Sequence, residues 1–241
     1  MTLIQPPNQH PNESARSWVY RSILEAIVYL DVKPTTLLDT GELQAIFNVS
    51  RTPLREAMIQ LARDGFVKLL PQRGSYVSPI DLDEVEKARF IRVCLEKEIL
   101  AQACDSCDDA TYRELRYVLD CQRDAAAGGG DNRALHGLDE KFHRIYFEAC
   151  KRGNIWTYLR SSNLHYLRFR ILNIPMQGMR EFTYNHHESL FKALVDRDKA
   201  KAASVIEQHL NTDNWTAKNL FEETPDWFTW SGREAALVNR G

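Results

Sequence analysis

The sequence predicts a mainly α-helical protein in which an N-terminal winged helix-turn-helix precedes an all-α antiparallel helical bundle. Three observations favour this fold class. Two short helical patterns and a hairpin pattern lie within residues 14–79, apolar residues recur at helical spacing from residue 83 onward, and no strand pattern follows residue 83. A chain of 241 residues is long enough for two domains.

The N-terminal segment, residues 1–13, is rich in Pro, Asn and Gln, and we expect a disordered arm there. A first helix from about residue 14 to 30 then carries Val19 and Ile23 on an apolar face. This helix is expected to pack behind the two short helices that follow.

Residues 48–57, Asn-Val-Ser-Arg-Thr-Pro-Leu-Arg-Glu-Ala, have the features of a DNA-recognition helix. Ser50 is expected to cap the helix by accepting a hydrogen bond from a free N–H, and Pro53 is tolerated in the first turn. Arg51 and Arg55 are four residues apart and therefore share one face. The opposite face is an apolar stripe: Leu54, Met58 and Leu61.

The flanking residues complete a winged helix-turn-helix. Leu38, Leu43 and Phe47 indicate a short preceding helix that ends at Asn48. Strand patterns at residues 66–70 and 75–78 flank Pro-Gln-Arg-Gly, which predicts a β-hairpin wing with Arg73 at its tip. Such a fold places the helix in the major groove and the wing tip beside or within the minor groove.

After a linker at residues 80–82, every segment has a helical pattern up to a C-terminal tail at residues 223–241. The second and third of these helices are separated by three alanines and three glycines, and the fourth and fifth by Pro175 and Gly178. The expected helices, within a domain spanning residues 83–222, are 83–105, 108–127, 131–151, 154–172, 180–197 and 199–221.

The charge distribution is compatible with DNA binding, although the net charge is −2. Residues 51–73 contain five Lys or Arg residues against Glu56 and Asp64, a local balance of +3. The sequence contains neither an apolar run long enough to cross a membrane nor a leader pattern, so a cytoplasmic protein is expected.

Five cysteines, an odd number, favour reduced thiols. Cys104 and Cys107 form a single Cys-x-x-Cys pair, which is a weak signal for a metal or redox site without a second pair. The other three, Cys94, Cys121 and Cys150, are expected to be small core residues of helices.

A second group of chemically notable residues lies in the helical region. Asp139 and His143 are four residues apart on one helix face, while His187 and His209 lie on later helices. One carboxylate and three imidazoles form a complete ligand set for a divalent ion. The alternative is a surface Asp/His salt bridge with histidines scattered by chance, and spacing alone leaves both open.

Residues 49–57, together with Leu61, Gly65 and the Gly74 wing, resemble the GntR family of bacterial transcription regulators. Many relatives carry Glu-Arg-Glu-Leu-Ala in the preceding helix, whereas this chain has Thr-Gly-Glu-Leu-Gln at residues 40–44, so Gly41 replaces an arginine. The resemblance implies an operator-binding role, with glycine allowing the wing backbone to approach DNA. The residues expected at the DNA are Ser50, Arg51, Thr52, Arg55, Arg73 and Gly74.

Residues 138–143, 187–194, 198–202 and 208–210 are similar to the FCD effector domain of FadR-type GntR regulators. In metal-binding members the ligand positions match Asp139, His143, His187 and His209. The resemblance therefore implies a bound divalent metal ion, with zinc expected first and nickel or manganese as alternatives. It is nearest to regulators of sugar-acid catabolism.

The resemblance also implies a small carboxylate or sugar-acid effector at the metal, with a guanidinium neutralising its second oxygen. Arg92 is the first candidate, because the matching helix of the family presents an arginine to its cavity. The alternative is an Arg92–Glu96 surface pair within one helix. The residues expected at the effector are Arg92, Glu96, Tyr166 and Arg168, with Arg170 considered on the same helix.

The function expected from these features is a transcription regulator, a repressor of a catabolic operon, that binds a short palindromic operator as a homodimer. Two alternatives were weighed. A metal-dependent hydrolase or oxygenase at the Asp/His cluster would need a general base beside the metal, and no such residue stands at motif spacing. A helical interaction protein without a ligand would leave the four convergent ligands unexplained.

Overall fold

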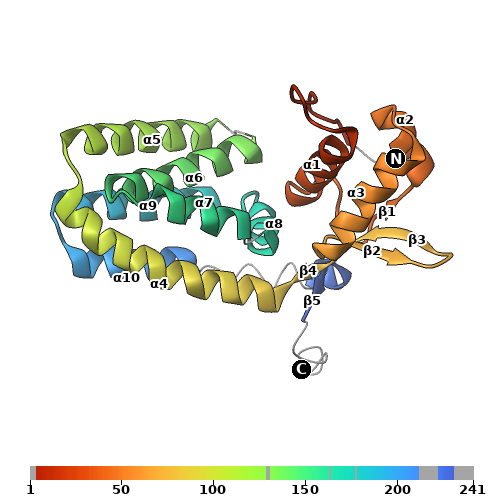
Figure 1. The fold of residues 1–241 in the computed structure, drawn as a ribbon. Helices are drawn as coiled ribbons and strands as arrows, with labels where there is room; N and C mark the ends of the chain where they lie inside the picture. Colours follow the sequence, from red (N-terminus) through yellow and green to blue (C-terminus); the bar gives the residue numbers. More distant parts are fainter. Residues whose placement is uncertain (1–3, 129–130, 163, 177, 212–221, 231–241) are drawn as a thin grey trace. The chain divides into compact units, whose positions relative to one another are not determined.

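The computed structural model describes residues 4–128, 131–162, 164–176, 178–211 and 222–230. The chain divides into two compact units, residues 1–83 with 221–241 and residues 84–220, which we call the winged-helix unit and the helical unit. Over the described residues, the first contains three α-helices, a short 3-10 helix (Pro225–Trp227) and short strands, and the second is built from helices (Figure 1). The predicted fold class is confirmed.

The winged-helix unit packs three helices against a small antiparallel sheet. Its helices are α1 (Ala15–Val28), α2 (Thr40–Phe47) and α3 (Arg51–Arg63). Its sheet has the order β1 (Leu37–Leu38), β3 (Gly74–Val77) and β2 (Val67–Leu70). The predicted wing is the β2–β3 hairpin, whereas β1 was not predicted, and it holds Leu38 in a strand rather than in the helix that follows.

The unit's core explains why these segments form amphipathic helices. Ile23 of α1, Leu43 of α2 and Leu54 of α3 are fully or almost fully buried. Trp18 packs edge-on against Phe47 with ring centroids 5.3 Å apart. Burial of such side chains supplies the main favourable free energy of folding, so the short helices are stabilised by their packing.

The N-terminal segment differs from the expected disordered arm over residues 4–13, which lie against α1. Ile4 is buried, and the indole N–H of Trp18 donates a hydrogen bond to the carbonyl of Pro7 at 2.7 Å. Glu13 and Arg21 form an ion pair at 2.8 Å. These contacts join residues separated in sequence, so composition alone did not reveal them.

The predicted linker and tail also differ, because they pair with each other. β4 (Ile80–Asp81) and β5 (Phe228–Thr229) form a two-stranded parallel sheet in the winged-helix unit. Ile80 and Phe228 are both buried in it. The linker residues 80–82 are therefore a strand followed directly by a helix, and part of the C-terminal tail is built into the first unit.

The helical unit contains seven described helices close to the predicted ones. The range 154–172, predicted as one helix, is occupied by two, and the predicted residues 212–221 lie outside the described residues. The bounds are α4 (Leu82–Ser106), α5 (Asp109–Ala127), α6 (Asn132–Ala149), α7 (Gly153–Ser162), α8 (Leu164–Asn173), α9 (Met179–Val195) and α10 (Lys199–Leu210).

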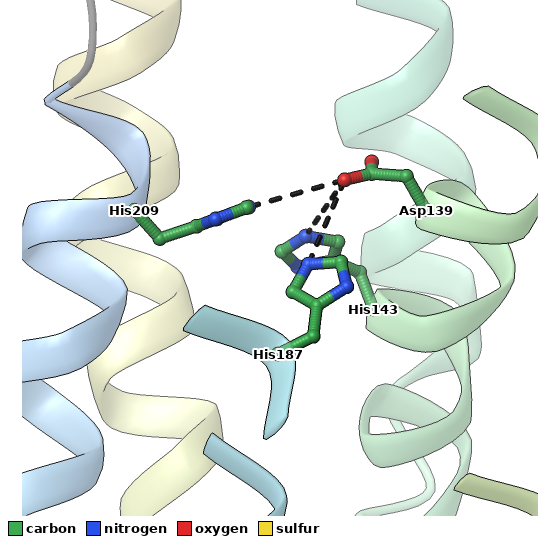
Figure 2. Close-up of side chains that lie close together, drawn as sticks. All are labelled: Asp139, His143, His187 and His209. Carbon is green, nitrogen blue, oxygen red and sulfur yellow. Dashed lines mark ion pairs between the residues drawn. The ribbon is translucent and has the colours of Figure 1, made fainter. Parts of the chain in front are cut away.

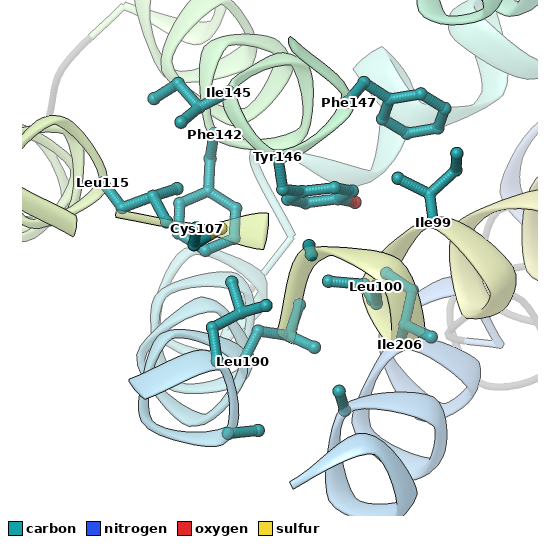
Figure 3. Packing of buried hydrophobic residues seen from close by; sticks show 14 of the residues in the cluster. Ile99, Leu100, Cys107, Leu115, Phe142, Ile145, Tyr146, Phe147, Leu190 and Ile206 are labelled. Atoms are coloured by element: carbon teal, nitrogen blue, oxygen red, sulfur yellow. The ribbon is translucent and has the colours of Figure 1, made fainter. Parts of the chain in front are cut away.

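The core of the helical unit is formed by residues of α4, α5, α6, α7, α9 and α10, part of which is drawn in Figure 3. Phe142, Tyr146 and Leu190 are fully buried there, and Cys104 and Cys107 belong to the same cluster. All five cysteines are free thiols. The expectation that Cys94, Cys121 and Cys150 are core residues is wrong for Cys94, which is exposed, while the other two are half-buried. Among the described residues, no helix has the length and apolar character needed to cross a membrane.

Candidate metal centre and nucleic-acid interface

The four predicted ligands meet inside the helical unit. Asp139 and His143 come from one face of α6, His187 from α9 and His209 from α10 (Figure 2). All four side chains are buried, and each offers a ligand atom within 4.8 Å of the others. Oδ1 of Asp139 lies 3.8 Å from Nε2 of His143, 3.6 Å from that of His187 and 3.9 Å from that of His209.

The facing atoms of this cluster have no hydrogen-bond partner among the described residues. They are Oδ1 of Asp139 and Nε2 of the three histidines. A buried polar atom without a partner is costly, typically about 1–3 kcal/mol each. Four such atoms converging on one point fit a divalent ion, because oxygen and imidazole nitrogen are ligands that such ions accept.

Polar groups behind the ligands fix their orientation. Nδ1 of His143 lies 2.6 Å from Oε2 of Glu96, to which it donates a hydrogen bond, and the Tyr146 hydroxyl bonds the same carboxylate. Nδ1 of His187 lies 3.0 Å from Oε1 of Gln122. Since Nδ1 carries the proton in both pairs, Nε2 of each ring faces the cluster with its lone pair.

The electrostatics favour a charged carboxylate at Asp139 and neutral imidazoles at His187 and His209. Burial alone would raise the pKa of Asp139, but the Arg170 guanidinium and the neighbouring imidazoles hold that pKa well below its usual range. Burial lowers the pKa of His187 to about 3 and lowers the pKa of His209 well below its usual value. Deprotonated ligands are the forms that bind a metal ion.

A cavity of about 70 Å³ adjoins the cluster and is lined by Asp139 and His209. Arg170, Tyr166 and Arg180 also line it. A cavity needs about 10–15 Å³ to hold one water molecule, so this cavity has room for a small organic acid. Arg170 and Arg180 bring two cations to this lining, which suits an anionic occupant.

The predicted effector residue Arg92 faces a different space. Its guanidinium is buried, pairs with Glu96 at 2.6 Å and lies over the rings of Trp156 and Tyr166. It lines a smaller cavity of about 20 Å³ that also contacts Tyr166 and Arg170. The alternative Arg92–Glu96 pair is thus present, but it is buried rather than on the surface.

The other three predicted effector residues differ in whether they line a cavity. Tyr166 lines both cavities. Glu96 is fully buried behind His143, and Arg168 is fully buried outside the lining of the two cavities. Arg170 and Arg180 do line the larger cavity. Sequence reasoning considered Arg170 without selecting it, and it missed Arg180, because helical spacing does not reveal which arginine of a helix faces a cavity.

The predicted DNA-binding residues lie on an exposed surface of the winged-helix unit. Arg51, Thr52 and Arg55 are exposed on the first half of α3, and Arg73 is exposed at the tip of the wing. Ser50 occupies the N-cap position, but its side chain makes no capping hydrogen bond, so the predicted cap is wrong in that detail.

Gly74, a predicted DNA-binding residue, is also required by the local structure of the wing. Its φ is +107°, a region that other residues rarely adopt, and an added Cβ would lie 2.8 Å from a methyl carbon of Leu37. The position therefore requires glycine to let β1 pack against the wing.

A winged helix with exposed arginines on α3, followed along the chain by a helical unit, is the architecture of a DNA-binding transcription regulator. Comparison with protein families agrees. The FCD domain model matches residues 88–212, and the model of bacterial regulatory proteins of the gntR family matches residues 15–77. The chain belongs to the GntR family of transcription regulators and carries an FCD domain.

Similar proteins carry matching names. The chain is 28% identical over 223 residues to the HTH-type transcriptional repressor RspR of Escherichia coli K12, covering 91% of this chain and 96% of that protein. It is 24% identical to the Nta operon transcriptional regulator of Aminobacter aminovorans, with coverages of 74% and 82%. It is 26% identical to the repressor NanR of Cronobacter sakazakii, with coverages of 71% and 72%.

Solved structures share the fold. E. coli McbR/YncC superposes with a TM-score of 0.64 at 18% identity, covering 87% of this chain and 98% of that one. A GntR regulator from Rhodococcus sp. RHA1 gives a TM-score of 0.63 at 19% identity, with coverages of 85% and 97%.

Proposed function

We propose that this regulator represses a catabolic operon and responds to a small carboxylate or sugar acid bound at a metal ion in its helical unit. The observation that carries the sensing part is the convergence of four unpaired, buried ligand atoms beside a cavity. The names of two relatives, which are called repressors, support the direction of regulation.

Asp139, His143, His187 and His209 are the proposed ligands of one divalent ion. Zinc is the expected ion because it suits imidazole-rich sites, and nickel or manganese are alternatives where availability decides. When bound, the ion would supply open positions that a carboxylate can fill. The protein's own groups orient the ligands and keep the carboxylate of Asp139 charged.

The proposed effector lies in the larger cavity, where Arg170 and Arg180 supply positive charge and Tyr166 supplies a wall. This changes the sequence-based assignment, which placed the salt bridge at Arg92. We assign Arg92 the role of holding Glu96 and the rings of Trp156 and Tyr166 in place.

At the DNA, a homodimer would present two copies of α3 to the half-sites of a short palindrome, with Arg51 and Arg55 in the major groove and Arg73 at the wing contact. Effector binding is expected to change operator affinity by about 1–3 kcal/mol. Thermodynamic reciprocity requires operator DNA to change effector affinity by the same factor.

Metal analysis combined with DNA binding tests this proposal. We expect about one ion per chain in the wild type and in the control variant His10→Ala, which removes an exposed imidazole of the winged-helix unit, and little metal in His187→Ala. Titration of candidate acids into an operator complex should shift affinity in the wild type but not in His187→Ala, whose metal-free DNA binding stays near that of the wild type. Full metal occupancy in His187→Ala would refute the ligand set.

A further inference from the structure

The four clustered side chains are not supported equally. Three have a polar partner behind them, and the fourth has none among the described residues. The supported ligands and their partners are Asp139 with Arg170, His143 with Glu96 and Tyr146, and His187 with Gln122.

The packing of the imidazole rings shows the same difference between His209 and the other two histidines. The imidazole of His143 stacks on Trp156 with centroids 5.6 Å apart and planes 5° apart, and that of His187 stacks on Phe142 at 4.2 Å and 8°. The ring of His209 is tilted against those of His143 and His187, at 34° and 47°. It meets the ring of His186 edge-on, with centroids 5.9 Å apart and planes at 71°, and has no stacked ring among the described residues. Two of the imidazoles are therefore held by a hydrogen bond and a stacked ring together.

His209 lacks both kinds of support. Neither of its ring nitrogens has a hydrogen-bond partner among the described residues. Its position on α10 is the last but one, since the helix ends at Leu210. The orientation of this ring is therefore the least constrained of the three.

The four proposed ligands also differ in whether they line the larger cavity. Asp139 and His209 line the larger cavity, while His143 and His187 are fully buried and lie outside its lining. A small molecule in this cavity therefore meets the ring of His209 without displacing the imidazole of His143 or His187.

From these differences we infer that Asp139, His143 and His187 are the fixed ligands of the metal, and that His209 is the exchangeable ligand. This inference rests on the proposed metal site. In the exchange, the bond from Nε2 of His209 breaks as a lone pair from a donor in the cavity replaces it. The imidazole leaves in its neutral form, so no proton has to move. Donors of this class are carboxylate oxygens and unprotonated imidazole nitrogens.

Metal affinities of matched variants test the inference. Zn²⁺ and Co²⁺ affinities would be measured by competition with a chelating dye for the wild type, His187→Ala, His209→Ala and the control His10→Ala, which removes an exposed imidazole of the winged-helix unit. We expect His187→Ala to lose about 100-fold or more, His209→Ala to lose about tenfold, and the control to lose nothing. Gln122→Leu should weaken binding by about tenfold because it releases the ring of His187.

Chemical rescue gives a second readout. Added imidazole should enter the cavity left by His209→Ala and restore both the affinity and the visible absorption spectrum of the Co²⁺ form. It should not rescue His187→Ala, whose site is closed. His209→Gln provides a variant of similar size should the alanine variant fail to fold, with the same modest loss expected.

The outcomes separate the two proposals. A wild type that binds neither ion would overturn the metal site and this inference with it. A wild type that binds metal, with equal losses in His187→Ala and both His209 variants and no rescue by imidazole, would overturn the inference and leave the metal site standing.

Discussion

The guanidinium of Arg170 lies 2.8 Å from Oδ2 of Asp139, while the other carboxylate oxygen faces the three imidazoles. One side chain thus connects the ligand cluster with the cavity wall, because Arg170 also lines both cavities. A carboxylate arriving in the larger cavity would meet a cation that is already paired with a proposed metal ligand. Arg170 is therefore placed to connect effector binding with the position of Asp139.

Removing Arg170 should destabilise the metal-free protein. In Arg170→Met the buried carboxylate of Asp139 loses its cation, and breaking such a pair typically costs about 3–5 kcal/mol of unfolding free energy. Urea denaturation of the helical unit in the presence of a chelator measures this loss. The double variant Arg170→Met/Asp139→Asn should recover part of it, because no unpaired charge remains.

Arg160→Met is the control for that experiment. Arg160 is more than half exposed and lies 3.4 Å from Glu140, so its loss should cost no more than about 1 kcal/mol. Equal destabilisation by both single variants would show that the Arg170–Asp139 pair has no special importance.

DNA recognition by α3 predicts a specific effect of one substitution. Arg51→Ala should cost about 1–3 kcal/mol of operator binding if the side chain contacts guanine, with less effect on a scrambled duplex. Arg73→Ala should weaken binding to both duplexes alike, because a wing contact to phosphate carries no sequence information. Fluorescence anisotropy with both duplexes distinguishes the two patterns.

Arg113→Ala is the matched control, since it removes the same charge from an exposed position on α5 in the helical unit. It should leave both affinities unchanged. If a folded Arg51→Ala binds the operator as tightly as the wild type, α3 is not the recognition helix.

The helical unit should fold and dimerise without the winged-helix unit. Its apolar cluster is made of residues from within the unit, so a fragment of residues 84–220 keeps the whole of that core. Analytical ultracentrifugation of the fragment and of the full chain at micromolar concentration tests the prediction. A folded but monomeric fragment beside a dimeric full chain would place the interface in the winged-helix unit.

Thiol reactivity should follow burial. Burial raises the pKa of Cys107 to about 12, so near pH 8 only about one thiol in ten thousand is the reactive thiolate. Cys94 is exposed. Iodoacetamide should therefore label Cys94 first, and labelling of Cys107 should rise about tenfold per pH unit while the fold persists. Peptide mass spectrometry follows both sites.

Unfolding in guanidinium provides the reference for thiol labelling, because all five cysteines should then react at similar rates. Labelling of Cys107 as fast as Cys94 in the native protein would contradict the burial of Cys107.

Much of the fold could be predicted because each helix carries its pattern of apolar residues within its own segment of the sequence. An apolar face repeated every three to four residues located α5, α6 and α9 to within a few residues of their ends. Strands of two residues, such as β1, β4 and β5, show no alternation. They exist through pairing with distant segments, which a local pattern does not contain.

The candidate site shows the same division. Asp139 and His143 share a helix face by spacing, and His187 and His209 were further candidates on later helices. The family resemblance then matched all four to ligand positions. The residues behind and beside them were harder to place. Glu96 belongs to α4 and Gln122 to α5, and only the packing of helices shows that one supports His143 and the other His187. For Ser50, by contrast, the predicted N-cap position is correct, but the predicted capping hydrogen bond is absent.

The pairing of β4 with β5 has a consequence for how the protein is made. Phe228 and Thr229 are synthesised more than a hundred residues after Ile80 and Asp81, yet they complete the same unit. Domains at the N-terminus of a growing chain generally fold first. Here the winged-helix unit can be completed only after Phe228 and Thr229 of β5 have been synthesised and have left the ribosome. A chain cut short after α10 would carry the recognition helix with the edge of β4 left open, and open strand edges invite aggregation.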